Sequence, residues 1–239
     1  MTALLRLEGI AKSYGSVVVA DAVDLELAEG EAVGVVGPNG AGKTSLLDLV
    51  TGLVRPDSGR VLLDGHDLTG VAVHARCRAG IGRTFQVPRP FGGMTVFENV
   101  LVAAVHGGGA RPGDAVPACV AALERTGLLE RANLVAGTLP LLARKRLELA
   151  RALATGPRLL LLDEIAGGLT EPEVAELVAT ILALRAEGLT ILWIEHIVHA
   201  LLSVVDRLVA IDVGRVLADG DPRTVMASPQ VQQVYLGAE

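Results

Sequence analysis

Gly37-Pro38-Asn39-Gly40-Ala41-Gly42-Lys43-Thr44 is the stretch of sequence that says most about the fold. It fits the pattern G-x-x-x-x-G-K-[ST], in which a glycine-rich loop holds phosphate groups. The context agrees with the pattern. Residues 32–36 are apolar and β-branched, which predicts a buried strand before the loop. Residues 43–53 carry apolar side chains at helical spacing, which predicts a helix after it.

Each part of this loop has a physical use. The glycines let successive backbone N–H groups point at one spot, and the start of the helix adds a partial positive charge. We expect Lys43 to reach the β- and γ-phosphates of a nucleotide as a point charge. Thr44 can offer its hydroxyl to Mg²⁺, and Ser45 can reach a phosphate. The motif predicts nucleotide binding and does not by itself name a reaction.

A second strand ends in two acids. Residues 159–162 are four leucines, followed directly by Asp163 and Glu164. Two carboxylates at the end of a buried strand are costly unless a positive group meets them, and a Mg²⁺ ion at the phosphate loop would be such a group. Asp163 is then the carboxylate on the metal side, and Glu164 can direct a water at the γ-phosphate. Because neighbouring strand residues face opposite ways, both can serve one site only just past the strand end.

The remaining pattern alternates strands with helices, which predicts an α/β fold with a mostly parallel sheet. We expect residues 1–86 and 156–239 to form the nucleotide-binding core and about 87–155 to form a helical insertion. The further expected strands are residues 5–8, 23–27, 60–63, 189–194, 208–211 and 216–218, and the further expected helices are 96–105, 117–125, 171–187 and 199–205.

Composition excludes several classes of protein. The net charge is −6, so a basic surface for nucleic acid is not expected. Hydrophobic residues make up 51% of the chain, but no run of about 18–20 apolar residues predicts a membrane span. The first residues show no signal-peptide pattern. Two cysteines are too few for a disulfide framework, and we expect both to be buried free thiols.

Four features, taken in order along the chain, resemble the ATP-binding subunits of ABC transporters. They are the phosphate loop, Gln86 in the sequence RTFQ, the pair Asp163–Glu164, and His196 in WIEH. The resemblance covers nearly the whole chain. Residues 83–91, 145–153 and 234–237 look most like the branched-chain amino-acid importer group, and within it like the first of its two ATPase subunits.

The resemblance implies an ABC ATPase fold, with an antiparallel β subdomain beside the parallel core, and ATP and Mg²⁺ as ligands. Tyr14 matches the aromatic residue that stacks on adenine. Gln86 matches the residue that contacts Mg²⁺ and water, and His196 the histidine that touches the γ-phosphate. The implied partners are membrane permease subunits, a second ATPase subunit and, indirectly, a solute-binding protein, with no nucleic acid. The implied location is peripheral, at the cytoplasmic face of the cell membrane. That the solute is a branched-chain amino acid is implied only by the resemblance. Related systems carry other amino acids, amides or urea.

One motif departs from the family. The signature loop, Leu-Ser-x-Gly-Gln in this group, touches the ATP that the partner subunit holds. The aligned residues here are Leu139, Pro140, Leu141, Leu142 and Ala143. Pro140 lacks the serine hydroxyl and a backbone N–H, and Leu142 puts a side chain where glycine would let phosphate approach. Two lost donors, at about 1.5–3 kcal/mol each, predict weak activation of the partner's ATP.

We therefore expect a heterodimer with one dominant hydrolytic site, formed by this chain's Lys43, Glu164 and His196 and the partner's intact signature loop. The alternative is a nucleotide-binding regulatory subunit with little turnover, which the altered signature favours and Glu164 and His196 oppose. Another phosphate-loop enzyme, such as a small-molecule kinase, fits the other motifs less well. A DNA-repair or translation ATPase is disfavoured by the single short cassette.

The segment after Gln86 is the expected contact with a permease. Residues 89–97 are apolar and glycine-containing, with Phe91, Met94 and Phe97 as the large side chains. The alternative for these three side chains is simple packing within the helical insertion.

Overall fold

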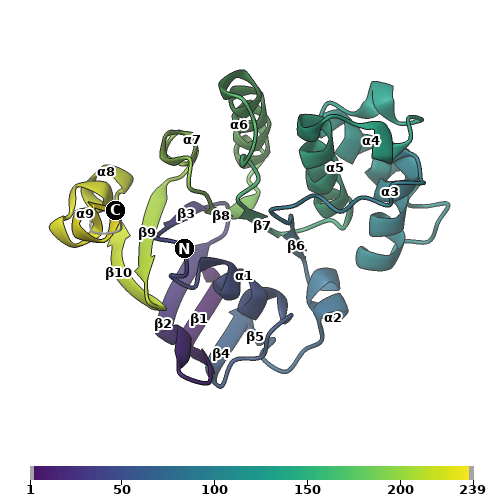
Figure 1. The fold of residues 1–239 in the computed structure, drawn as a ribbon. Coiled ribbons are helices and arrows are strands. Elements are labelled where there is room, and N and C mark those ends of the chain that lie inside the picture. The colour runs from purple at the N-terminus through teal and green to yellow at the C-terminus, as the bar shows by residue number, and fades with distance from the viewer. Residues whose placement is uncertain (1–2, 237–239) are drawn as a thin grey trace.

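Six strands form the central sheet, in the order β10-β9-β3-β8-β7-β6 (Figure 1). The structure is a computed structural model that describes residues 3–236. Neighbouring strands from β9 to β6 run parallel, and β10 pairs antiparallel with β9 at the edge. The strands are β3 (Ala32–Val36), β6 (Ile81–Arg83), β7 (Leu159–Asp163), β8 (Thr190–Ile194), β9 (Arg207–Asp212) and β10 (Arg215–Gly220). Every residue of β3, β7 and β8 is buried, as in parallel strands covered on both faces.

A second sheet is antiparallel, with the order β2-β1-β4-β5. Its strands are β1 (Ala3–Tyr14), β2 (Val17–Ala28), β4 (Ser58–Leu63) and β5 (His66–Asp67). Along β2 buried residues alternate with more exposed ones from Val23 to Leu27, so one face of this sheet packs inward and the other meets solvent. This sheet is the antiparallel subdomain that the family resemblance implies.

Two hydrophobic layers follow from the strand alternation. On β7, Leu159 and Leu161 pack toward the antiparallel sheet and α1 (Lys43–Thr51), which lies in the same layer. Leu160 and Leu162 pack on the opposite face, in the cluster that contains α6 (Glu171–Ala186) and α7 (Val198–Leu202). The central sheet is therefore covered on both faces, which explains why β3 and the four leucines of β7 are apolar at successive positions.

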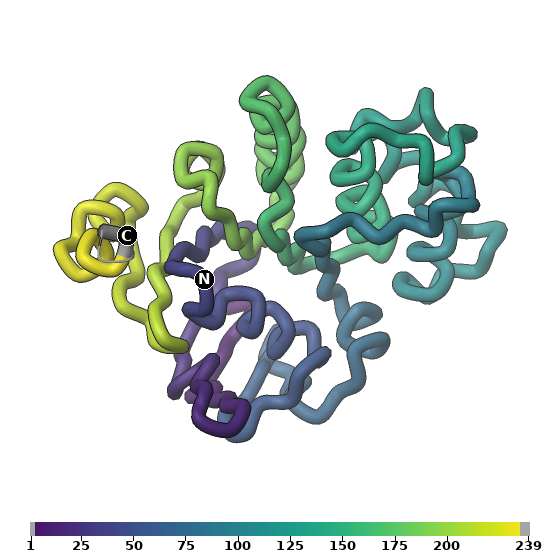
Figure 2. Tube along the Cα trace, viewed as in Figure 1, coloured from purple at the N-terminus to yellow at the C-terminus, as the bar shows by residue number. Residues whose placement is uncertain are grey.

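The helical insertion forms a lobe to one side of the sheet, beyond β6, in Figures 1 and 2. The chain crosses into this lobe after β6 and returns to the sheet at β7. The lobe contains α3 (Val96–Val102), the π-helical turn η1 (Ala103–Gly107), α4 (Val116–Arg125), the 3₁₀ turns η2 (Leu129–Arg131) and η3 (Ala136–Thr138), and α5 (Leu141–Ala154). Its buried side chains join the same cluster as the α6 face of the sheet, so the lobe shares a core with the rest of the chain.

Several elements differ from the sequence expectations. The strands β1 and β2 are far longer than residues 5–8 and 23–27, and the short β5 and β6 were not expected. Neither were α2 (Val73–Arg78), α8 (Pro222–Ala227) and α9 (Pro229–Leu236). Gly237, the last residue of the 234–237 motif, lies outside the described residues. Within residues 3–236, no helix is long and apolar enough to cross a membrane. Cys119 is buried as expected, but Cys77 is only half-buried.

Candidate functional site

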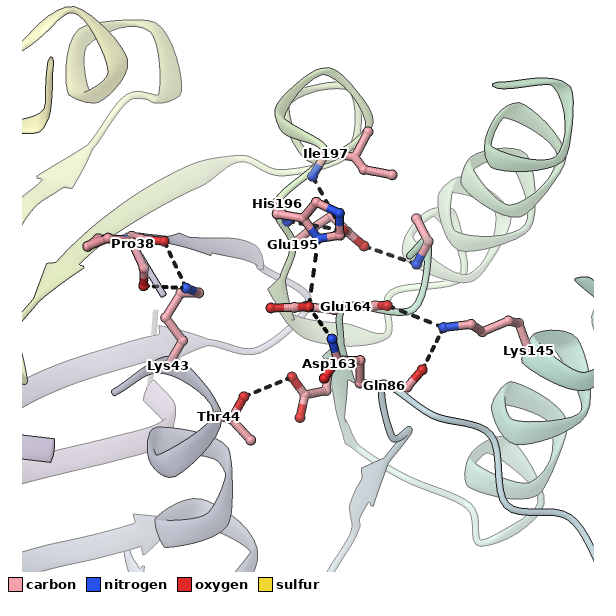
Figure 3. Close-up of polar contacts among 12 residues, drawn as sticks. Pro38, Lys43, Thr44, Gln86, Lys145, Asp163, Glu164, Glu195, His196 and Ile197 are labelled. Carbon is pink, nitrogen blue, oxygen red and sulfur yellow. Dashed lines mark hydrogen bonds and ion pairs between the residues drawn. The ribbon is translucent and has the colours of Figure 1, made fainter. Parts of the chain in front are cut away.

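The phosphate loop, Gln86, Asp163, Glu164 and His196 meet at one edge of the parallel sheet (Figure 3). Four strands end there: β3 leads into the phosphate loop, β6 into Gln86, β7 into Glu164, and β8 into His196. The carboxyl ends of neighbouring parallel strands share an edge, so segments far apart in the sequence become neighbours. The order β3-β8-β7-β6 places the strand that carries Glu164 between those that carry His196 and Gln86.

Two glycines of the phosphate loop are required by its close packing. Gly37 has a φ of 157°, and a Cβ there would lie 2.1 Å from the carbonyl oxygen of Ile211. Gly42 precedes α1 with a φ of 99°, and a Cβ there would lie 2.1 Å from the carbonyl oxygen of Val19. Any larger residue at either position would push the loop away from the neighbouring strands, which explains why the motif needs glycine at these two places.

Lys43 lies inside the curl of the loop. Its Nζ donates hydrogen bonds to the carbonyl oxygens of Gly37 and Pro38, at 2.8 and 2.9 Å. Burial lowers the pKa of Lys43, and the carboxylates of Glu164 and Asp163 partly offset this. The ammonium group is thus mostly removed from water and held at the centre of the loop, where an anion would stabilise its charge.

A polar cavity of about 410 Å³ opens beside the loop. Gln86 and Glu164 line one wall, and Lys43 the floor of the loop. The other lining residues are Val17, Val19, Asn39, Gly40, Gly42, Thr44 and Ser45. The cavity therefore joins the phosphate loop to the ends of β6 and β7, and it has the size of a small-ligand site.

Asp163 is the last residue of β7 and is almost completely buried. The hydroxyl of Thr44 donates to its Oδ1 at 3.4 Å, and the guanidinium of Arg83 pairs with its Oδ2 at 2.9 Å. Arg83 also pairs with Asp48 of α1 at 2.5 Å. A buried carboxylate needs such partners, and Arg83 both neutralises Asp163 and links it to the helix that follows the phosphate loop.

Glu164 lies one residue past the strand, where its backbone has a φ of 43°. This left-handed conformation is uncommon for a residue other than glycine and costs about 1–3 kcal/mol. It turns the Glu164 carboxylate toward the same edge as Asp163. The Gln86 amide donates to Glu164 Oε2 at 2.6 Å, and His196 Nδ1 lies 3.7 Å from the same oxygen. The geometry thus brings Glu164, Gln86 and His196 together, as the sequence predicted.

Three charged side chains around the site were missed by sequence reasoning. Besides Arg83, they are Lys145 and Glu195, both buried. The Nζ of Lys145 donates to the carbonyl oxygen of Gln86 at 2.6 Å and to that of Glu164 at 3.4 Å. Burial lowers the pKa of Lys145, partly opposed by surrounding carboxylates, of which Glu195 is the strongest. The one sequence signal that could have identified them is their position, because each lies in a motif segment quoted above.

Tyr14 stands apart from the cavity. It is the last residue of β1, its side chain is 52% exposed, and it is not among the residues that line the cavity. The ammonium of Lys12 lies 5.3 Å from the centre of its ring. Val17 and Val19, on the next strand, line the cavity instead. The exposed ring of Tyr14 is free to stack on a base.

The segment in the place of the signature loop begins α5. Pro140 is the N-cap residue, with extended backbone and no side-chain capping bond. The first bond that closes the helix runs from Arg144 N to the carbonyl oxygen of Pro140, at 3.0 Å. The N–H groups of Leu141, Leu142 and Ala143 therefore belong to the first turn, which has no partner inside the helix. Leu141 is exposed, whereas Leu142 packs partly against the core.

Of the large apolar residues expected to meet a permease, two face outward. Phe91 and Met94 are exposed, at 45% and 39%, while Phe97 packs against the core of the lobe. Phe85, directly before Gln86, is also exposed. It lines an apolar cavity of about 170 Å³ together with Leu53 and Val73, among others. Exposed apolar side chains thus lie both before and after Gln86 in the sequence.

Comparison with protein families gives two matches. Residues 20–167 match the family described as ABC transporter, and residues 215–239 match the one described as branched-chain amino acid ATP-binding cassette transporter. The first match covers more than half of the chain. It includes the phosphate loop, Gln86, the pair Asp163–Glu164 and the altered signature segment, whereas His196 falls outside it.

Curated relatives and solved structures agree with this family. BraF of Pseudomonas aeruginosa, named a high-affinity branched-chain amino acid transport ATP-binding protein, is 38% identical over 98% of both chains. LivG of Escherichia coli, which bears the same description, is 37% identical over 98% of both chains. LptB of Acidithiobacillus ferridurans, a lipopolysaccharide export ATP-binding protein, is 37% identical over 99% of this chain and 98% of its own. The crystal structure of an ABC transporter cassette in its ADP conformation matches with a TM-score of 0.90 at 30% identity, over 99% of this chain and all of that one.

Proposed function

The chain belongs to the ABC transporter ATP-binding family, and we propose that it is the ATP-hydrolysing subunit of an importer for branched-chain amino acids. Proteins of this family couple ATP hydrolysis to transport. The overall sequence identity to relatives does not indicate the solute, because relatives named for branched-chain amino acid transport and for lipopolysaccharide export are almost equally similar to this chain. The observation that carries the choice is the match of residues 215–239 to the branched-chain family.

In this proposal the phosphate loop holds the β- and γ-phosphates of ATP. Lys43 turns its ammonium from the loop carbonyls toward the phosphate oxygens, and the backbone N–H groups of residues 39–45 complete the cradle. Tyr14 stacks on the adenine ring. The shape of the loop and the burial of Lys43 support the phosphate-binding roles, since the site is built around a charge that an anion would neutralise, and the role of Tyr14 rests on its exposed ring.

Mg²⁺ fits the residues present, because hydroxyl, amide and carboxylate oxygens are the ligands it prefers. Thr44, Gln86 and Asp163 would hold it, and the bound ion would neutralise charge on the phosphates. Thr44 and Asp163 are already in contact through their oxygens, and Arg83 leaves only one oxygen of Asp163 for other partners.

Glu164 is the proposed catalytic carboxylate. It lies at the cavity wall, where it can orient a water or accept its proton. Gln86 and His196 lie against its Oε2 and would position the same water and the γ-phosphate. The left-handed backbone at Glu164 aims this carboxylate at the site instead of at the sheet.

A second ATPase subunit is part of the proposal. Pro140 and Leu142 leave this chain with a poor surface for the partner's ATP, so a homodimer would have two weak sites. A partner with an intact signature loop would complete the site built by Lys43, Glu164 and His196. A nucleotide-binding regulatory subunit is the second candidate, favoured by the same Pro140 and Leu142.

The permease contact is assigned to the apolar surface around Gln86. It consists of Leu53, Val73, Phe85, Phe91 and Met94, all exposed. Phe85 precedes Gln86 and shares a cavity with Leu53 and Val73, while Phe91 and Met94 follow Gln86 in the chain, so a permease bound there would respond to movement of Gln86. Phe97 is excluded because its side chain packs inward.

The decisive experiment compares ATP hydrolysis by the purified chain with hydrolysis by the transporter complex purified through a tag on this chain. We expect a low rate for the chain alone, and a rate in the complex that Glu164→Gln abolishes. Uptake of labelled leucine by cells should fall with the same variant. A complex that binds ATP but hydrolyses none would select the regulatory candidate. Hydrolysis without leucine uptake would leave the ATPase assignment standing and overturn the solute.

A further inference from the structure

Glu195 is a buried carboxylate that none of the proposed steps uses. It lies at the end of β8, with 1% of its surface exposed. Its Oε2 accepts a hydrogen bond from the N–H of Ala166 at 3.0 Å. Its Oε1 accepts from the N–H groups of His196 and Ile197, at 3.0 and 3.3 Å. Burying a charge is costly unless it is fully bonded, so this arrangement calls for a purpose beyond filling space.

The same carboxylate also faces the ring of His196. Glu195 Oε1 lies 3.1 Å from His196 Nδ1 (Figure 3). The two atoms form a close electrostatic contact: a hydrogen on Nδ1 would attract the carboxylate oxygen, whereas a lone pair on Nδ1 would repel it, so the geometry favours the hydrogen on Nδ1. Fixing one ring nitrogen in this way also fixes the orientation of the ring and leaves Nε2 to meet other groups. A carboxylate partner that orients a catalytic histidine is a general arrangement in enzymes.

Glu195 also joins two loops that leave neighbouring strands. Ala166 lies two residues after Glu164, in the loop that follows β7, and His196 lies in the loop that follows β8. The two oxygens of Glu195 bond to both loops at once. His196 and Glu164 therefore keep a common position at the site, with Nδ1 and Oε2 3.7 Å apart.

We propose that Glu195 is a positioning residue that holds the hydrogen on Nδ1 of His196 and ties the loop of His196 to the loop of Glu164. This inference rests on the role proposed above for His196. It assigns a task to a buried side chain that is not among the residues lining the cavity. Its effect on hydrolysis passes through the ring of His196 and the placement of Glu164.

Nitrogen-15 NMR of the histidine rings tests the first half in the purified chain. The chain has five histidines, and His196→Gln identifies the signal of His196. We expect the wild-type ring to carry its hydrogen on Nδ1. Glu195→Met, which keeps the volume and removes both oxygens, should release this preference, and Glu195→Gln, which keeps one acceptor oxygen, should restore it at least in part. A wild-type hydrogen on Nε2, or an unchanged signal in Glu195→Met, would overturn the proposal.

A matched control uses the exposed pair Glu171 and His199, whose Oε2 and Nε2 lie 3.3 Å apart. Glu171→Met should change only the signal of His199 and leave hydrolysis by the complex unaltered. The wild-type spectrum alone tests the position of the hydrogen, so the proposal stays open to refutation even if Glu195→Met fails to fold.

Kinetics of the assembled complex test the second half. Glu195→Met should lower kcat roughly 10- to 100-fold, because the His196 ring loses its carboxylate contact and the two loops lose their shared hydrogen-bond acceptor, and it should leave KM for ATP unchanged. Unchanged kcat in Glu195→Met, with a loss in His196→Ala, would overturn the positioning role alone. Unchanged kcat in His196→Ala would instead overturn the role proposed for His196.

Discussion

Repair of the signature segment is expected to give the isolated chain an ATPase activity of its own. The double variant Pro140→Ser with Leu142→Gly restores the hydroxyl and the open approach that the family's signature loop provides. The backbone at Pro140 is extended, with φ −66° and ψ 166°, which serine adopts readily as an N-cap residue. Both new residues therefore fit the start of α5 without rearrangement.

The size of the gain follows from the two restored contacts. A hydrogen bond to a charged phosphate contributes about 1.5–3 kcal/mol, so two give about 3–6 kcal/mol. At 1.4 kcal/mol for each factor of ten, the repaired homodimer should hydrolyse ATP about 10²- to 10⁴-fold faster than the unaltered chain. The cost in stability is smaller. Glycine in the first turn costs about 1 kcal/mol and part of the packing of Leu142 is lost, while a serine cap offsets some of this.

Phosphate release by the purified chain is the assay, with thermal unfolding as the measure of stability. We expect the repaired chain to be active and its Tm to fall by about 2–8 °C. Glu164→Gln in the repaired background should remove the gained activity. Pro140→Ser with Leu141→Gly is the matched control, because it places glycine on the same turn but leaves Leu142 in place, and it should gain at most the part of one contact, about 10- to 100-fold.

A repaired chain that is folded, binds ATP and remains inactive would refute the reasoning. The absence of turnover would then have a source other than residues 140 and 142. An unaltered chain that is already as active alone as in the complex would refute it from the other side, since the signature segment would not limit hydrolysis.

Three further predictions concern the rest of the chain. Tyr14→Ala should weaken ATP binding about 5- to 150-fold, and Tyr14→Phe should not, in a fluorescent-nucleotide titration; equal affinities would exclude the stacking role. Burial raises the pKa of the Cys119 thiol, so at pH 8 this thiol should be labelled far more slowly in the native chain than in urea, and rapid native labelling, measured by mass spectrometry, would contradict the fold there. The Lys12 ammonium holds the pKa of Asp57 below its usual value, so this carboxylate stabilises the fold above the ordinary aspartate pKa of 3.8 and loses its effect as the pH falls toward the lowered value. Asp57→Asn should therefore flatten the acid side of the stability profile, followed by the fluorescence of buried Trp193, and an unchanged profile would show that the pair contributes nothing.

The phosphate loop and the end of β7 could be predicted because their signals are local. A glycine-rich turn between a buried strand and a helix has one structural solution, and the requirement that Asp163 and Glu164 serve one site places Glu164 past the strand. The structure shows how this is achieved: the backbone at Glu164 is left-handed. The sequence did not signal this conformation, because the residue is neither glycine nor asparagine.

The contacts of Arg83 and Lys145 could not be predicted, because they depend on tertiary distance. Arg83 reaches Asp163, which lies 80 residues away, and Lys145 reaches a carbonyl 59 residues away. Each residue lies in a motif segment, but the local sequence does not show which distant group it contacts. The same reasoning explains the missed strand β5, since two residues at a sheet edge have no pattern of their own.

Lys145 gives α5 a mechanical connection that is independent of the signature chemistry. The helix begins at the segment expected to face the partner subunit, and one turn later it holds the backbone of both Gln86 and Glu164. A displacement of the start of α5 would therefore move both loops, because Lys145 is hydrogen-bonded to the backbone of each. This connection does not depend on residues 140 and 142. A partner subunit that pressed on the start of α5 could therefore still displace Gln86 and Glu164.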